Sequence, residues 1–389
     1  MDTAEPSLSA PRTSAWRRVA ESVDRVAWTE STRVVLASRI VFLAVAYAAT
    51  WFLANTQGRS TVGFLQMWNQ WDVQHFLRIA DKGYFAYPDF PNEIAFFPLF
   101  PMLIKGLAAI GFNPVLGGMI ISFVSSLVAG NYLFKLAEHD APGSGRRALL
   151  YLFLFPTAVF LVAPYSEALF LAGAIAAFYY ARRERWVLVG LPAAVAVGSR
   201  AAGIFLLIGL AVEFLRQRKF GLDRISQAAI AFAVGLLPLL LYGFYLTTET
   251  GSPWSFMEAQ RRGWYREFTS PIKAFTATWE TWNGSYATNW IFAWRVEILG
   301  AIVGVVFVAW ALRKREWGYA AFMGTTLASL MTSSWYFSIP RILLTFFPAL
   351  LFLAAWTGKR DGRHEIALMV LMPLAALGVV VFTRGIWFF

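Results

Sequence analysis

The chain has 389 residues, of which 58% are hydrophobic, 17% aromatic and only 15% charged. Soluble domains carry about 25% charged residues, so this composition excludes an ordinary soluble enzyme. The net charge of +11 does not indicate a nucleic-acid-binding protein, because most lysines and arginines form short clusters between apolar segments. The chain has no cysteine, which excludes disulfides, thiolate nucleophiles and cysteine metal sites within it.

The first 32 residues form a polar segment without the short apolar core and small-residue cleavage site of a secretory signal. It contains four arginines: Arg12, Arg17, Arg18 and Arg25. We expect residues 1–14 to be disordered, residues 15–32 to form an interfacial helix, and the whole segment 1–32 to be cytoplasmic. Residues 33–389 are then predicted to form a single transmembrane domain.

Eleven apolar segments are predicted to cross the membrane as helices, since a bilayer core of about 30 Å needs roughly 20 apolar residues. These segments are 34–54, 115–137, 147–163, 165–181, 186–199, 201–216, 226–246, 291–312, 317–334, 340–357 and 364–383. The predicted fold class is therefore an all-α polytopic membrane protein.

The positions of the basic clusters predict which loops face the cytoplasm. Short cytoplasmic loops are rich in lysine and arginine. If the apolar stretch 95–111 also crossed the membrane, Arg146 and Arg147 would move outside, so this stretch is predicted to lie on the outer surface or to dip in and return. Two long outer loops follow, at about 55–114 and 247–290. The second is rich in aromatic residues and is predicted to form interfacial helices.

An ionisable cluster lies in the first outer loop, in the stretch WNQWDVQHFLRIADKGY. The pattern predicts an amphipathic helix over 68–82, with Asp72 and His75 on one face. Lys82 suits its last turn and Gly83 its C-terminal cap. The simplest interpretation is an interfacial helix with a hydrated polar face. The alternative is that Asp72 belongs to a site.

Three further charged residues lie at predicted outer ends of membrane segments. Glu167 begins a segment directly after a turn, where it either complements the helix dipole or faces the same cavity as Asp72. Arg200 and Arg341 belong to no cytoplasmic cluster. Each either extends its charge to the membrane surface or binds a phosphate through its planar guanidinium.

Carboxylates beside arginines suit the transfer of a group from a lipid phosphate to a hydroxyl. Asp72 would act as general base and arginine would stabilise the departing phosphate. The sequence contains no G-x-x-x-x-G-K-[ST], no H-E-x-x-H and no D-x-D motif, so the nucleotide-binding and metal-dependent chemistries of those motifs are not indicated. A divalent cation at the donor phosphate stays open, since Asp72, Glu167 and His75 could supply ligands.

Several blocks of the chain resemble the PIG-V-like mannosyltransferases, bacterial relatives of the second mannosyltransferase of GPI-anchor synthesis and members of the GT-C superfamily. The blocks are WDVQHFLRIADKGY, AFFPLFP, FPTAVFLVAPYSEALF and SRAAGIF, with weaker agreement at IPRILLTFFP. The resemblance implies a GT-C helical bundle whose first outer loop carries the catalytic acid. It also implies a polyprenyl-phosphate mannose donor and inversion at the anomeric carbon.

The resemblance implies roles for individual residues. Asp72, which follows Trp71, matches the acid of the first loop, and Glu167 matches the acid that opens a later segment. Arg200 and Arg341 are candidates for binding the phosphate. The remaining candidates for substrate contact are Trp71, His75 and Lys82.

The expected protein is thus a glycosyltransferase of the plasma membrane with an extracytoplasmic site, a cytoplasmic N-terminus and a lipid-linked or extracytoplasmic acceptor. Protein partners and the identity of the acceptor are not indicated by the sequence. Two alternatives are weighed against it. A lipid or sugar transporter would favour two-half symmetry and ionisable groups at the membrane centre, which the sequence does not show. A non-catalytic scaffold would tolerate changes at Asp72.

Overall fold

The computed structural model describes residues 13–55, 63–86, 92–219, 225–283 and 288–388. Within these ranges the chain is helical, and an isolated bridge between Phe268 and Ser333 is the sole β-type pairing. The predicted all-α class is confirmed.

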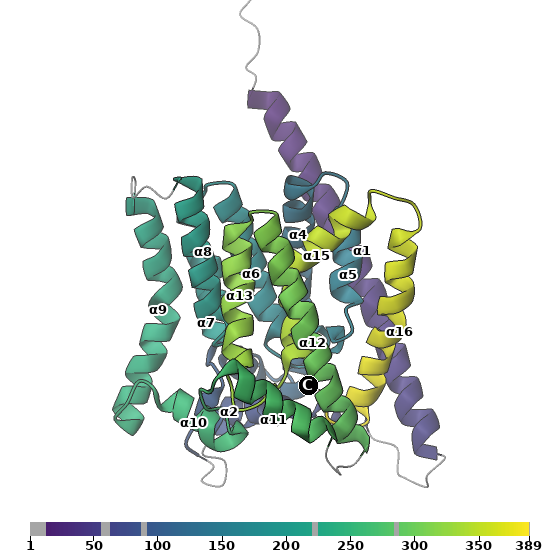
Figure 1. Ribbon diagram of the computed structural model, residues 1–389, viewed down its shortest axis with the longest axis vertical. Coiled ribbons are helices and arrows are strands. Elements are labelled where there is room, and N and C mark those ends of the chain that lie inside the picture. The colour runs from purple at the N-terminus through teal and green to yellow at the C-terminus, as the bar shows by residue number, and fades with distance from the viewer. Residues whose placement is uncertain (1–12, 56–62, 87–91, 220–224, 284–287, 389) are drawn as a thin grey trace, which may run out of the picture.

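The eleven predicted membrane segments each contain a helix. Five helices of the described chain are long and apolar enough to cross a membrane: α1 (Thr13–Asn55), α4 (Pro114–Asp140), α9 (Ile225–Thr250), α12 (Thr288–Arg313) and α16 (Arg363–Thr383). The other six segments hold shorter or interrupted helices: α5 (Gly145–Phe153), α6 (Glu167–Arg182), α7 (Gly190–Ser199), α8 (Gly203–Gln217), α13 (Trp317–Met331), and α14 (Ile339–Leu343) with α15 (Phe347–Thr357). Together they form one bundle (Figure 1).

The predicted separate interfacial helix at 15–32 is wrong. Residues from Thr13 onward belong to α1, which continues without a break into the first membrane segment and projects beyond the bundle at the top of Figure 1. An uninterrupted run of helix-compatible residues, without proline or glycine between Thr13 and Asn55, explains this continuity.

The two ends of the bundle differ in composition. The connections α4–α5, α6–α7, α12–α13 and α15–α16 and the end of α8 lie together at the top of Figure 1, and they carry most of the basic clusters of the sequence. We call this the basic end. The opposite end, which we call the site end, holds the short helices α2 (Asp72–Lys82), α3 (Leu99–Ala109), α10 (Ser255–Trp264) and α11 (Pro271–Asn283). The predicted grouping of the basic clusters is therefore confirmed.

The first long loop folds into short helices, as predicted, but with a different start. α3 has 11 residues and spans about 16 Å, too little to cross a bilayer core. The predicted helix over 68–82 begins only at Asp72, because Trp71 has φ 55° and ψ −119° and breaks the helix. Its predicted end is confirmed, since Lys82 is the last residue and Gly83 follows with φ 88°.

The connection between α5 and α6 is not α-helical, yet it lies inside the bundle. Its carbonyl groups need partners there, because no water is available in an apolar core. Arg39 of α1 donates to the carbonyl oxygen of Leu161 at 2.5 Å and to Ser126 Oγ at 2.6 Å. Ser122 Oγ of α4 donates to the carbonyl oxygen of Ala163 at 2.8 Å. A buried arginine and two serines thus stabilise the irregular segment that leads to Glu167.

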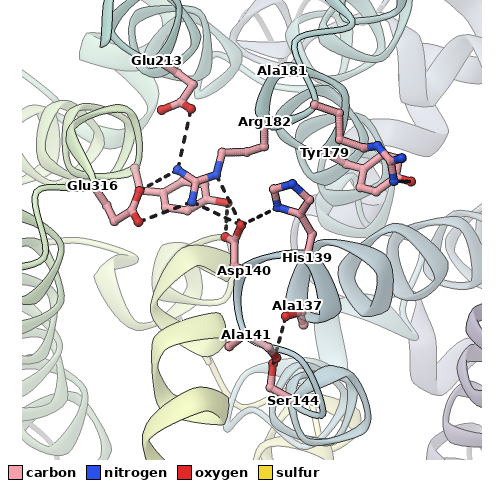
Figure 2. A network of polar contacts seen from close by, with 12 residues as sticks. Ala137, His139, Asp140, Ala141, Ser144, Tyr179, Ala181, Arg182, Glu213 and Glu316 are labelled. Atoms are coloured by element: carbon pink, nitrogen blue, oxygen red, sulfur yellow. Dashed lines mark hydrogen bonds and ion pairs between the residues drawn. The ribbon is translucent and has the colours of Figure 1, made fainter. Parts of the chain in front are cut away.

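A network of charged side chains fastens four elements at the basic end (Figure 2). Its centre is Arg182, at the end of α6. The guanidinium lies 2.6 Å from a carboxylate oxygen of Glu316, 3.2 Å from Asp140 and 3.6 Å from Glu213. These carboxylates come from the start of α13, the end of α4 and α8. One cation therefore holds three separate helices against α6.

Replacing Arg182 with methionine should destabilise the protein, because Asp140 and Glu316 would lose their arginine partner in a partly desolvated place and Glu213 would be left with Arg216. Removing one partner of a buried ion pair costs on the order of 3 kcal/mol. We expect a clear drop in the thermal unfolding temperature of the purified protein in detergent. The control is Arg183→Met, since Arg183 is exposed and lies over the Tyr179 ring. Equal unfolding temperatures for the two variants would contradict this role.

Candidate active site

Two carboxylates and two arginines from separate segments meet at the site end of the bundle. Arg341 donates from Nη1 to Asp72 Oδ2 at 2.6 Å, across 269 positions of sequence. Its Nε donates to Glu167 Oε1, and Arg200 pairs with this same oxygen through Nη1. The structure thus brings together the four charged residues that the sequence singled out at the outer ends of segments.

The guanidinium of Arg341 lies over two adjacent aromatic rings. Its central carbon lies 4.8 Å from the ring centre of Phe160 and 4.6 Å from that of Tyr165. Such cation–π contacts strengthen when water is excluded. The Tyr165 hydroxyl also accepts from the backbone N–H of Asp72 at 3.3 Å and donates to the Gln70 carbonyl at 3.4 Å. Tyr165 therefore links the start of α2 to the start of α6.

The position of Arg341 is fixed by a buried carboxylate on another helix. α14 is one short turn, and its first N–H groups have no partners within the helix. Glu297 of α12 accepts from the backbone N–H of Ser338 at 2.6 Å and of Ile339 at 2.8 Å, and it is completely buried. Ser338 has φ 65°, the left-handed conformation in which the chain enters the helix. Glu297 thus caps the turn that presents Arg341.

The backbone is strained directly before Asp72. Trp71 has a positive φ, and its ψ of −119° lies far from the left-handed helical region. Strain of this kind costs on the order of 1–3 kcal/mol and gathers at functional sites. The conformation makes Asp72 the first residue of α2, where the helix dipole stabilises a negative charge.

The two carboxylates differ in their access to solvent. The Asp72 side chain is 23% exposed, whereas that of Glu167 is 0% exposed. Burial raises the pKa of the Asp72 carboxyl, but the charge and hydrogen bond of Arg341 outweigh it, so the pKa lies below its ordinary value. Asp72 is therefore ionised at neutral pH and reachable by a ligand. Glu167 contacts Arg200 and Arg341 on the side away from solvent.

One cavity, which we call the arginine cavity, lies between α2, α7–α8 and α13–α14 and has a volume of about 190 Å³. Its charged lining residues are Asp72, Arg200, Arg266 and Arg341. Its apolar lining residues include Phe76, Phe96, Phe205, Leu330 and Ile342. Positive charge beside an apolar wall suits an anionic group attached to a lipid chain.

Arg266 is the site residue that the sequence did not reveal. It follows α10 in the second long loop and donates to the Phe337 carbonyl at 3.3 Å. Burial lowers the pKa of Arg266 to about 10, partly offset by the charge of Glu297, so it stays protonated at neutral pH. In the sequence it follows Arg261 and Arg262 closely, and no local signal separates it from these exposed neighbours.

A second cavity of about 590 Å³ adjoins the first, and we call it the tryptophan cavity. Its lining residues include Gln70, Trp71, Asp72, Gln74, His75, Arg78, Trp264, Arg341 and Trp387. Asp72 and Arg341 line both cavities. The carboxylate therefore lies at the boundary of the two cavities.

The remaining predicted site residues have different surroundings. Trp71 and His75 line the tryptophan cavity, and His75 Nδ1 lies 3.0 Å from the buried Glu93 carboxylate. Lys82 is exposed at the far end of α2 and lines neither cavity. Substrate contact by Lys82 is thus not supported by this geometry.

The predicted metal ligands do not form a cation site. Asp72 and Glu167 are both bound to Arg341, whose charge occupies the place that a cation would take. The described part of the chain contains no group of three or more His, Asp or Glu side chains arranged to hold a metal ion. We therefore derive no step through a metal.

Comparison with known proteins identifies the family of the chain. The family model described as Mannosyltransferase (PIG-V) matches residues 47–249. The chain belongs to this family. The matched region contains Asp72, Glu167 and Arg200, so the PIG-V match covers three of the four clustered charges. Arg341 and its cap Glu297 lie beyond it.

Curated relatives of the PIG-V family match parts of the chain. GPI alpha-1,6-mannosyltransferase 2 of Cricetulus griseus is 31% identical over 219 residues, which is 50% of this chain and 43% of that protein. The protein of the same name from Homo sapiens is 34% identical over 157 residues, 36% of this chain and 30% of that protein. GPI mannosyltransferase 2 of Yarrowia lipolytica is 24% identical over 262 residues, 66% and 69% of the two chains. The alignments thus span less than half of the mammalian relatives.

Replacing Glu297 with leucine should displace Arg341, because the first turn of α14 would lose the acceptor for two N–H groups. We expect weaker binding of an anionic ligand in the arginine cavity, by about tenfold or more for one or two lost charge-assisted hydrogen bonds. Glu297→Gln keeps one acceptor oxygen and should lie between leucine and the wild type. Binding of a polyprenyl phosphate to the purified protein measures this.

The control for Glu297 is Glu280→Gln, an exposed carboxylate on α11. It should bind the polyprenyl phosphate as the wild type does. If Glu297→Leu folds and binds the phosphate with unchanged affinity, Arg341 does not depend on this cap.

Proposed function

We propose that the chain transfers a mannosyl group from a polyprenyl-phosphate donor to a hydroxyl of a lipid-linked or extracytoplasmic acceptor. The observation that carries the proposal is the position of Asp72 in a PIG-V family chain. It is a partly exposed carboxylate, bound to Arg341, at the boundary of two cavities. A general base that contacts the acceptor while the donor is bound beside it must lie at such a boundary.

The charge of the arginine cavity supports a lipid phosphodiester as donor. Three guanidinium groups, those of Arg200, Arg266 and Arg341, line it, and the carboxylates paired directly with them are those of Asp72 and Glu167. Arg266 forms no direct ion pair with a carboxylate of the described chain, so its guanidinium can pair with one negative charge of a ligand. A polyprenyl-phosphate sugar carries one negative charge, whereas a nucleoside-diphosphate sugar carries two. The apolar residues of the cavity suit the first isoprene units.

In the proposed reaction, Asp72 accepts the proton of the acceptor hydroxyl as its oxygen bonds to the anomeric carbon. The bond between the anomeric carbon and the phosphate oxygen breaks, and its electron pair leaves with the polyprenyl phosphate. Attack from the face opposite the phosphate inverts the anomeric configuration. The arginines stabilise the charge that grows on the departing phosphate, which is effective because they are fixed before the reaction.

Glu167 has a positioning role in this proposal. Its side chain lines neither cavity, and one of its oxygens binds both Arg200 and Arg341. It therefore holds the two guanidinium groups together against their mutual repulsion. The role as a second catalytic acid, which the family resemblance implied, stays a prediction.

The proposed orientation follows from the two ends of the bundle. With the basic end in the cytoplasm, the positive-inside rule places both cavities at the extracytoplasmic surface of the plasma membrane. Lipid-linked donor and acceptor are available there within the bilayer. Uptake of a labelled lipid donor without any glycosylated product would favour the transporter alternative.

Replacing Asp72 with asparagine should abolish the general base and leave the donor site intact. General bases contribute about 10²–10⁴-fold, so transfer of labelled mannose from polyprenyl-phosphate mannose should fall by at least 10²-fold. Donor binding should remain, because Arg200 and Arg341 keep Glu167 as partner. Asp81→Asn on the same helix is the control, since Asp81 is exposed and lines neither cavity. Full transfer activity in Asp72→Asn would refute the mechanism.

The pH dependence of transfer should show no loss of the base near neutrality. The charge of Arg341 holds the pKa of Asp72 below its ordinary value, so the carboxylate stays ionised as pH falls and is protonated only at a lower pH than an ordinary aspartate. The kcat/KM of the free enzyme should thus be constant between about pH 5 and 8 with respect to this group. An acidic limb centred near pH 6 that disappears in Asp72→Asn would contradict the assignment.

A further inference from the structure

The tryptophan cavity reaches the same carboxylate as the arginine cavity but differs from it in charge. Arg78 pairs with the buried Glu93 at 2.6 Å, and His75 contacts the other oxygen of Glu93. Arg341 pairs with Asp72. The two guanidinium groups that line this cavity are therefore each paired with a carboxylate of the protein. A neutral ligand therefore fits it better than a second anion.

The side chains that line the cavity are of the types that commonly contact carbohydrates in proteins. Trp71, Trp264 and Trp387 offer broad apolar faces, and Trp71 is 40% exposed. Gln70 and Gln74 add amide groups, each of which both donates and accepts, as vicinal hydroxyls require. The volume of about 590 Å³ lies in the range of small-molecule sites. Flat aromatic faces and neutral amides together match a hydroxyl-rich ring.

The segment after α16 builds one wall of this cavity. Gly385, Trp387 and Phe388 line it. The Phe388 ring stacks on Phe160 with centres 6.1 Å apart and packs closely against Gly378, where an added Cβ would lie 2.9 Å from the ring. The Trp387 ring lies 5.0 Å from that of Phe337. Phe388 thus anchors the segment, and Trp387 faces the cavity.

We infer that the tryptophan cavity is the acceptor site, that it takes a neutral carbohydrate or polyol headgroup, and that Trp387 is a stacking platform for it. This inference rests on the proposed transfer reaction. It adds the chemical class of the acceptor and assigns a specificity residue to a part of the chain outside the PIG-V match.

The test uses the purified full-length protein, labelled polyprenyl-phosphate mannose, and two acceptor probes of equal chain length, octyl α-mannopyranoside and 1-octanol. Transfer should occur to the glycoside and not to the alcohol. Trp387→Ala should raise the KM for octyl mannopyranoside about tenfold, as expected for the loss of one aromatic contact, and leave the KM for the donor unchanged. Trp387→Phe should recover part of the affinity. Ile386→Ala, an exposed neighbour that does not line the cavity, should match the wild type.

Saturation-transfer NMR gives a readout without turnover, since octyl mannopyranoside should receive saturation from the wild type and less from Trp387→Ala. Equal transfer to octanol, or an unchanged acceptor KM in a folded Trp387→Ala, would overturn the inference while the transfer reaction stands. A wild-type protein that hydrolyses the donor but never glycosylates the glycoside would also overturn the inference. If the wild type neither binds nor consumes the donor, the proposed function fails, and this inference fails with it.

Discussion

The site depends on one interaction, the shared binding of Arg341 by Asp72 and Glu167. It joins three segments, the start of α2, the start of α6 and the turn of α14. Each of these charges would be costly to bury alone, because desolvation of an isolated ion exceeds any single hydrogen bond. Together they are stable, and their geometry is set before a substrate arrives. Such preorganisation is the condition under which fixed charges accelerate a reaction.

The protein contains a second cluster with the same chemistry and a different consequence. Arg182 at the basic end binds three carboxylates, as Arg341 at the site end binds two. Acidic groups outnumber the arginine there, and the network ties helix ends together. At the site end Arg200 and Arg341 are ion-paired, and Arg266, which forms no direct ion pair in the described chain, lines a cavity. The balance of charge and the presence of a cavity thus distinguish a binding site from a structural ion-pair network.

Much of this arrangement could be predicted from local signals in the sequence. Apolar length gave the membrane segments, basic clusters gave the ends of the bundle, and charges at the outer ends of segments gave Asp72, Glu167, Arg200 and Arg341. Arg266 gave no such signal, and Glu297, near the outer end of the predicted segment 291–312, gave no sign of its partners. Glu297 acts by accepting two N–H groups some 40 positions away, and this contact exists only in the folded chain. The break at Trp71 was missed for a related reason, because tertiary contacts of Tyr165 with residues 70 and 72 support it.

In the proposed reaction, the two cavities would separate the two substrates by charge. In the proposed reaction, a phosphodiester would gain attraction in the arginine cavity, where Arg266 forms no direct ion pair within the described chain, and would gain less in the tryptophan cavity, where Arg78 is already bound to Glu93. A neutral sugar has the opposite preference. It loses little free energy on leaving water for aromatic faces and amides, but it cannot supply the negative charge that pairs with the arginines. Both proposed substrates would meet where Asp72 and Arg341 line the two cavities. In the proposed reaction the phosphate, the anomeric carbon, the hydroxyl and the Asp72 carboxylate follow one another in this order. An inverting transfer needs this order.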